Sequence, residues 1–137
     1  SNALFLQISE HADFDSKHLG LIENDPSLLK AYQLYFESCG FKVHIIPLKE
    51  DDFQNTLLEL SHLDFILSDY RLEDKDGIYY IQRLREEFAA DIPACILTAD
   101  TSPQHLNLFN QLNIQVLYKP IEVSKITEFI FKQLNIA

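Results

Sequence analysis

Several features that define whole classes of protein are scarce or absent in this chain of 137 residues. It has only 3 glycines and 5 prolines, which is too little low-complexity sequence for a disordered chain. No apolar run approaches the roughly 20 residues that span a bilayer. The two cysteines, Cys39 and Cys95, form no CxxC pair and have no histidine at zinc spacing, so we expect buried thiols in a reducing compartment.

Basic residues are also scarce, because 11 Lys and Arg stand against 21 Asp and Glu, a formal net charge of −10. A negative field of this size repels phosphate backbones and anionic lipids, so nucleic acid and membrane surfaces are poor partners. Metal cations and basic protein surfaces are still compatible with it. No glycine-rich phosphate loop is present, which argues against a nucleotide-binding protein. The chain length suits one packed core, and we expect a single acidic, cytoplasmic domain.

The first residues differ from the rest of the chain in their pattern of apolar and charged residues. Ser1-Asn2-Ala3 resembles the scar left by tag cleavage, and the residues up to about 17 mix apolar and charged types without a clean period. We therefore predict a tag scar and linker over residues 1–17 and one folded domain over residues 18–137.

Short apolar runs alternate with longer segments of helical period from Leu19 onward. The runs are almost wholly apolar, as expected for strands that are covered on both faces, and lie at residues 19–22, 43–46, 65–68, 94–97 and 115–118. Helices are expected after Asp25-Pro26, around Phe53, after Gly77, from Ser102-Pro103 and from Ser124. This alternation predicts an α/β fold, a doubly wound parallel sheet with helices on both faces.

Polar residues follow four of the predicted strands at their carboxyl ends. In such sheets the functional crevice lies beyond these ends, where the strand order reverses. The fold would therefore gather residues that span nearly a hundred positions of the chain: Glu23, Asn24 and Asp25 after the first strand, Asp69 after the third, Thr98 after the fourth, and Lys119 after the fifth.

This set of side chains is suited to phosphoryl transfer onto a carboxylate. Asp69 could act as the nucleophile toward phosphorus. Glu23, Asp69, a main-chain carbonyl and Asn24 could hold Mg²⁺, which prefers oxygen ligands and keeps several waters. Lys119 and the Thr98 hydroxyl could bind the oxygens of the transferred group, where charge spreads in the transition state.

Each of these residues also has a plain structural explanation when it is taken alone. Asp69 could be a turn or capping residue, and we favour a capping role for Asp25, which precedes Pro26. Thr98 could satisfy backbone groups at a strand end, and Lys119 could be a solvated side chain. Only their joint placement at four strand ends favours a functional site.

Two other groups of polar residues are interpreted without a function. The acidic run at residues 73–76 is expected to be a solvated loop rather than a calcium site, because the ligand spacing of an EF-hand is absent. The histidines are scattered along the sequence and are expected to be surface or partly buried residues, not ligands: His11, His18, His44, His62 and His105.

Four motifs in this order resemble the receiver domain of two-component response regulators over roughly residues 18 to 135. They are Leu21-Ile22-Glu23-Asn24-Asp25-Pro26, Ile66-Leu67-Ser68-Asp69-Tyr70-Arg71-Leu72 with Gly77 eight residues past Asp69, Ile96-Leu97-Thr98-Ala99-Asp100, and Leu117-Tyr118-Lys119-Pro120. The residues of these motifs are most similar to those of the receivers at the end of hybrid sensor histidine kinases. The resemblance implies a flavodoxin-like (βα)5 fold with strand order 2-1-3-4-5.

The resemblance also implies roles for single residues. Asp69 matches the phosphorylated aspartate, Thr98 the switch hydroxyl, and Lys119 the lysine that pairs with the aspartate, in a Lys-Pro bond that is commonly cis. Glu23 and Asn24 match the acidic pair that helps to hold Mg²⁺, together with the main-chain carbonyl of Arg71. The domain would take a phosphoryl group from a histidine kinase or a histidine phosphotransfer domain and slowly hydrolyse it. A homodimer is possible.

Two positions depart from the family pattern. Asn24 is a neutral amide at the second acidic position, so we expect weaker Mg²⁺ binding than at an all-acid site. Val116 stands where many receivers carry a switch aromatic, and Tyr118, two residues further along the strand, could partly substitute for it.

Three functions compete on these observations. The first is a phosphoacceptor switch at Asp69, and the second is a pseudo-receiver that acts as a phosphorylation-independent interaction module. The third, a metal-dependent phosphatase, is disfavoured because such enzymes usually place a second acid two residues after the nucleophile, where this chain has Arg71.

Overall fold

The computed structural model describes residues 17–135 of the chain, so the predicted tag scar and linker lie almost entirely outside the described residues. Each predicted strand agrees with an observed strand to within one residue at either end. The elements are β1 (His18–Ile22), α2 (Pro26–Ser38), β2 (Lys42–Ile45), α3 (Glu50–Glu59), β3 (Phe65–Asp69), α4 (Gly77–Phe88), β4 (Ala94–Thr98), α5 (Pro103–Gln111), β5 (Gln115–Tyr118) and α6 (Val123–Gln133).

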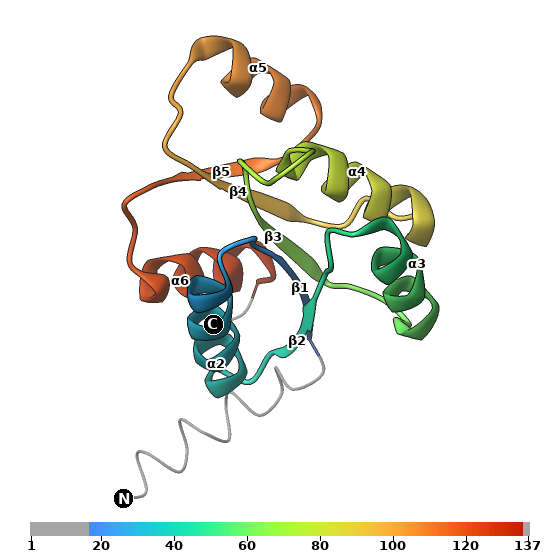
Figure 1. Cartoon of the computed structure of the whole chain (residues 1–137). Helices are drawn as coiled ribbons and strands as arrows, with labels where there is room; N and C mark the ends of the chain where they lie inside the picture. Colours follow the sequence, from blue (N-terminus) through green and yellow to red (C-terminus); the bar gives the residue numbers. More distant parts are fainter. Residues whose placement is uncertain (1–16, 136–137) are drawn as a thin grey trace, which may run out of the picture.

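The strands form one parallel sheet in the order β2-β1-β3-β4-β5, which confirms the expected topology. Helices α2 and α6 cover one face of this sheet, and α3, α4 and α5 cover the other (Figure 1). Each face carries its own hydrophobic cluster, built around Phe36 and Phe65 on the first face and around Phe53 and Phe109 on the second. The sheet is thus held between two helical layers, with its carboxyl edge left for polar residues.

Capping residues define where the helices begin. The Asp25 carboxylate accepts hydrogen bonds from the N–H groups of Ser27 and Leu28 at 2.9 and 3.2 Å, which confirms its predicted capping role. Asp76 caps α4 in the same way by accepting from the N–H of Tyr79 at 3.0 Å, so α4 begins at Gly77 itself.

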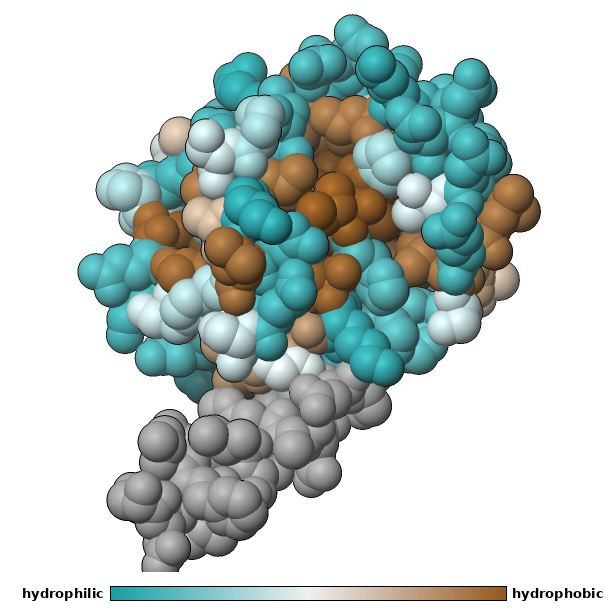
Figure 2. Space-filling view, turned by 60° about the horizontal axis from the view of Figure 1, so that its bottom comes forward, coloured by the Kyte–Doolittle hydropathy of each residue, from teal (hydrophilic) through white to brown (hydrophobic). Residues whose placement is uncertain are grey.

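Burial differs between the inner and the outer strands. Every residue of β3 and β4 is buried, as predicted for strands covered on both faces, whereas both end residues of β2 and of β5 are exposed because these strands form the edges of the sheet. On the face drawn in Figure 2, hydrophobic residues gather toward the centre and hydrophilic residues surround them. Among residues 17–135, no helix is both long and apolar enough to cross a membrane.

Both cysteines are free thiols. Cys95 is buried as expected, and its burial raises the pKa of the thiol to about 12, whereas Cys39 is only half-buried.

Three histidines that are far apart in the sequence lie together at the amino-terminal edge of the sheet. His18 and His44 are half-buried and His62 is exposed, in agreement with the expectation of surface or partly buried residues. The Nδ1 atom of His18 lies 2.7 Å from Nε2 of His44, and the ring centroids of His18 and His62 are 4.3 Å apart. His62 contacts the carboxylate of Asp64 at 3.3 Å. In the described part of the chain, no three His, Cys, Asp or Glu side chains are grouped to hold a metal ion, and His11 lies outside that part.

This histidine cluster predicts a pH dependence of stability. Burial, followed by the neighbouring imidazoles and Lys42, lowers the pKa of His44 below its ordinary value of 6.5, and burial followed by the charge of His62 does the same for the pKa of His18. The folded chain therefore takes up protons less readily than the unfolded chain, so stability is complete above pH 6.5 and falls as the pH drops below that value.

We expect the melting temperature of the wild type to fall more steeply between about pH 7.5 and 5.5 than that of His44→Gln. Comparing the two proteins at each pH isolates the cluster, because all other titrating groups are shared. Equal slopes in thermal denaturation would contradict the prediction.

Candidate functional site

Charged side chains from the ends of β3 and β5 meet at the carboxyl edge of the sheet. Asp69 is the last residue of β3, and the Nζ atom of Lys119, which follows β5, lies 2.5 Å from its Oδ1 atom. The N–H of Lys119 donates to the carbonyl of Thr98 at 2.9 Å, which fixes the Lys119 backbone beside β4. The bond from Lys119 to Pro120 is cis, as the resemblance implied.

Glu23 joins this pair from the end of β1. It is only 8% exposed, and it reaches Asp69 because β1 and β3 are neighbours, with Ile22 paired to Ser68. The two carboxyl groups share a hydrogen bond. Burial, and then the negative charge of Asp69, raise the pKa of Glu23 to about 7, although the positive charge of Lys119 acts in the opposite direction.

The residues at this edge fit a divalent cation. Two buried carboxyl groups, Glu23 and Asp69, lie here with one ammonium group, so that their combined negative charge exceeds the positive charge of Lys119. Mg²⁺ needs few protein ligands because it keeps several waters, so Glu23, Asp69 and a main-chain carbonyl are a sufficient set. Asn24, the fourth predicted ligand, is exposed in the turn before α2.

Thr98 lies at the same edge, at the end of β4. Its side chain is buried, and the neighbouring Leu97 pairs with Asp69 across the sheet. The Thr98 Oγ1 atom accepts a hydrogen bond from the N–H of Asp100 at 3.0 Å. The predicted strand ends therefore do converge, with Glu23 and Lys119 in contact with Asp69 and with Thr98 on the adjacent strand.

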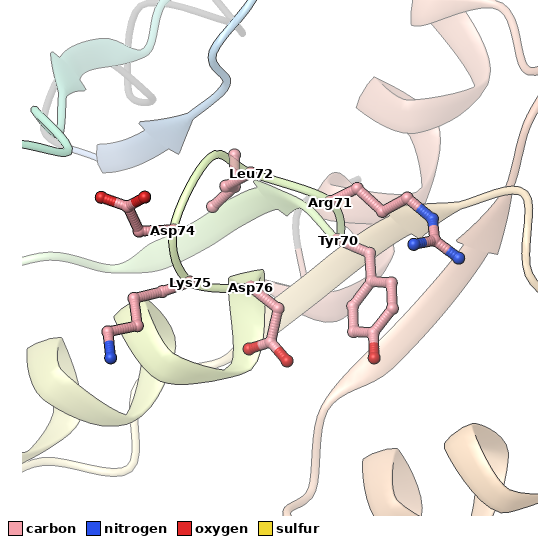
Figure 3. A pocket seen from close by; sticks show the side chains of 6 residues that line it. All are labelled: Tyr70, Arg71, Leu72, Asp74, Lys75 and Asp76. Atoms are coloured by element: carbon pink, nitrogen blue, oxygen red, sulfur yellow. The ribbon is translucent and has the colours of Figure 1, made fainter.

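The loop between β3 and α4 borders an open cavity beside the site (Figure 3), lined by Tyr70, Arg71, Leu72, Asp74, Lys75 and Asp76. Figure 3 shows the side chains of Tyr70 and Arg71 on one side of the loop and those of Asp74 and Lys75 on the other. The Arg71 side chain is 80% exposed, with Nη2 3.9 Å from the Asp100 carboxylate. The acidic run is the solvated loop that was predicted, since Glu73, Asp74 and Lys75 are exposed.

A glycine allows this loop to pack closely against β3. A Cβ atom at Gly77 would lie 2.5 Å from the carbonyl oxygen of Asp69 and 2.7 Å from the Oγ atom of Ser68. The N–H of Gly77 donates to the carbonyl of Tyr70 at 2.9 Å. The first residue of α4 therefore sets the backbone position of Asp69.

Three residues near the site were not singled out as functional candidates from the sequence. Tyr70, Asp100 and His105 form contacts beside Asp69 and Thr98. Their positions in the chain follow no pattern that marks such contacts, because 35 residues separate Tyr70 from His105.

A doubly wound sheet with two carboxyl groups and a lysine at its carboxyl edge is the arrangement that the four motifs implied. The model of the response regulator receiver domain matches residues 19–131, and the chain belongs to this family. It is 28% identical over 106 residues to the transcriptional regulatory protein GlrR of Escherichia coli (strain K12), a match that covers 77% of this chain and 23% of that protein. The chain thus spans about a quarter of the length of the curated relatives it matches.

Solved structures share the fold at low sequence identity. A CheY-like response regulator receiver domain protein from Methanospirillum hungatei JF-1 is 17% identical with a TM-score of 0.73, and the match covers 87% of this chain and 94% of that one. A two-component response regulator from Clostridium difficile is also 17% identical with a TM-score of 0.73, covering 88% of this chain and 97% of that one.

The close approach at Gly77 predicts a large effect of a single methyl group. We expect Gly77→Ala to lower the free energy of unfolding by about 1–3 kcal/mol, because the new Cβ meets backbone and cannot be relieved by a rotamer change. Gly20→Ala is the matched control, since its Cβ would meet only side-chain atoms, the nearest being the end of Leu63 at 3.1 Å. Urea denaturation measures both, and an equal cost at the two positions would contradict the assignment.

The charge at Glu23 predicts a stabilising substitution. Since the pKa of Glu23 is raised to about 7, the stability that its protonated form contributes is present at low pH and lost as the pH rises through 7. Without divalent cations at about pH 8, we expect Glu23→Gln to raise the free energy of unfolding by about 1–3 kcal/mol.

This gain should shrink at about pH 5, where Glu23 is already protonated in the folded protein. Glu59→Gln, at an exposed position, is the control. A loss of stability in Glu23→Gln at pH 8 would contradict the electrostatic account.

Proposed function

We propose that this receiver domain is a phosphoacceptor switch that takes a phosphoryl group from a phosphohistidine protein onto Asp69 with the help of Mg²⁺. The observation that carries the proposal is the grouping of two buried carboxyl groups, Glu23 and Asp69, with the half-buried ammonium group of Lys119 at the carboxyl edge of the sheet. Receiver domains interact with histidine kinases or phosphotransfer proteins, which supply such a donor.

The reaction needs one covalent exchange at phosphorus. A carboxylate oxygen of Asp69 forms a bond to phosphorus while the bond between phosphorus and the donor imidazole nitrogen breaks. The nitrogen keeps the electron pair, and the donor leaves as a neutral imidazole because its other ring nitrogen carries a proton, while an acyl phosphate forms on Asp69. Lys119 and the Thr98 hydroxyl bind the phosphoryl oxygens.

Mg²⁺, when bound, neutralises the negative charges of the carboxylates and the incoming phosphoryl group. Glu23, Asp69 and the main-chain carbonyl of Arg71 would hold it, with Asn24 as a neutral neighbour. Attack of water on the acyl phosphate then slowly restores Asp69 and resets the switch.

The partner is a histidine kinase or a histidine phosphotransfer domain that presents a basic surface, since this chain carries a net charge of −10. From the residues of the four motifs, we further infer that the domain is attached to a hybrid sensor histidine kinase. A kinase core encoded in the same reading frame would support this placement, and a DNA-binding domain there would contradict it.

Beryllofluoride, an analogue of the acyl phosphate, tests the function directly. We expect the wild type to bind it in the presence of Mg²⁺ and Asp69→Asn to lose this binding, because the carboxylate oxygen that would bond to beryllium is absent. Asp91→Asn, at an exposed position in the turn between α4 and β4, is the matched control and should bind like the wild type. Amide spectra in solution report the binding.

Equal binding by the wild type and Asp69→Asn would contradict the phosphoacceptor role. No binding of Mg²⁺ or of the analogue by the wild type, with partner binding that survives Asp69→Ala, would instead support the pseudo-receiver that the neutral Asn24 and Val116 suggest.

A further inference from the structure

A chain of polar contacts runs from Thr98 to helix α5 and back to the end of β3. The N–H of Asp100 donates to Thr98 Oγ1 at 3.0 Å. The Asp100 carboxylate accepts a hydrogen bond from the N–H of Ser102 at 2.8 Å and lies 2.8 Å from Nδ1 of His105. On the other side of the imidazole ring, Nε2 of His105 lies 3.2 Å from the hydroxyl of Tyr70.

One tautomer of the His105 imidazole satisfies both ends of this chain of contacts. When the ring proton is on Nδ1, Nε2 of His105 accepts a hydrogen bond from the Tyr70 hydroxyl. In this tautomer Nδ1 donates to the Asp100 carboxylate, which also accepts from the N–H of Ser102. The contacts of Asp100 and Tyr70 with His105 are therefore compatible with each other.

Tyr70 connects the far end of this chain of contacts to the loop that follows Asp69. It directly follows Asp69, and its N–H donates to the carbonyl of Leu97 at 2.9 Å. Its ring is only 9% exposed and packs edge-on against Phe109 of α5, with ring centroids 5.6 Å apart. The first two turns of α5 thus contact the residue after Asp69 and, through Asp100, the hydroxyl of Thr98.

Helix α5 has few other anchors. Phe109 is its one fully buried residue, and its N-cap residue, Ser102, makes no capping hydrogen bond with its side chain. The Ser102 hydroxyl instead lies 3.0 Å from Nδ1 of His105. The position of the first turn of α5 therefore depends strongly on His105 and its contacts with Asp100 and Tyr70.

We propose that Asp100 and His105 are positioning residues for the Thr98 hydroxyl, and that phosphorylation of Asp69 displaces the first turn of α5 through them. The inference rests on the proposed function. A phosphoryl group on Asp69 adds acceptor oxygens beside Thr98. When the Thr98 hydroxyl turns toward them, it gives up the hydrogen bond from Asp100, and the loop and the helix turn bound to Asp100 move with it.

This route supplies a link that the sheet lacks at Val116. Val116 is a half-buried residue that packs against the hydrophobic cluster around Phe109, and its aliphatic side chain cannot accept or donate a hydrogen bond. Tyr118 is 39% exposed beside Thr98. The polar contacts through His105 connect Thr98 to a helix, whereas the side chain of Val116 offers no polar contact.

Contacts that exist only in the unphosphorylated arrangement favour that arrangement, so removing them favours the other. With Mg²⁺ present, we expect His105→Leu to bind beryllofluoride about threefold to tenfold more tightly than the wild type, the effect of losing one or two hydrogen bonds to a charged group. His105→Asn keeps a donor near the position of Nδ1 and should stay within about twofold of the wild type. Gln104→Leu, exposed on the same helix, is the control.

Tyr70→Phe keeps the ring packing and removes only the hydroxyl, so it serves as a second variant if His105→Leu does not fold. It should also bind the analogue more tightly than the wild type. In spectra of the ring nitrogens, the signals of His105 should shift when the analogue saturates the wild type. If the role of His105 were purely structural, His105→Leu would change the melting temperature, and His105→Asn would not restore the wild-type affinity for beryllofluoride.

Unchanged or weaker affinity in both His105→Leu and Tyr70→Phe, with binding by the wild type intact, would overturn this inference alone. Ring signals of His105 that do not move at saturation would do the same. If the wild type itself does not bind the analogue, the proposed function fails and this inference fails with it.

Discussion

The contact of Asp69 with Lys119 and Glu23 is the interaction on which the site depends. It exists because the strand order places β1 beside β3 and β5 one strand beyond β4, so that Glu23 and Lys119 reach one carboxylate from opposite sides. Two carboxyl groups lie there with a single ammonium group, and burial, followed by the negative charge of Asp69, raises the pKa of Glu23 to about 7. The same imbalance that opposes folding makes the edge of the sheet receptive to a cation.

The fold holds these charges on its most rigid parts. Strands β3 and β4 are buried along their whole length between two hydrophobic clusters, and the carboxylate stands at the last residue of β3. Gly77 lets α4 begin directly against the backbone of Asp69. The loop after β4 and the first turn of α5 are held mainly by polar contacts, which can be exchanged at lower cost than buried apolar ones.

The sequence predicted the strands to within one residue because short apolar runs between polar segments are a strong signal. It also predicted the capping by Asp25, because an aspartate directly before a proline is a local signal for the start of a helix. The exposure of the edge strands β2 and β5 was missed, because an apolar run does not reveal its place in the sheet. The grouping of His18, His44 and His62, and the contact of Tyr70 with His105, could not be predicted, because tertiary folding alone brings these residues together.

The identity of the modified residue tests most directly the proposal that Asp69 accepts the phosphoryl group. The protein is incubated with phosphoramidate and Mg²⁺, reduced with borohydride, which converts an aspartyl phosphate to homoserine, and digested for mass spectrometry. The account predicts homoserine at position 69, dependent on Mg²⁺. Homoserine at a different aspartate, or an unmodified Asp69 in a folded protein, would contradict it.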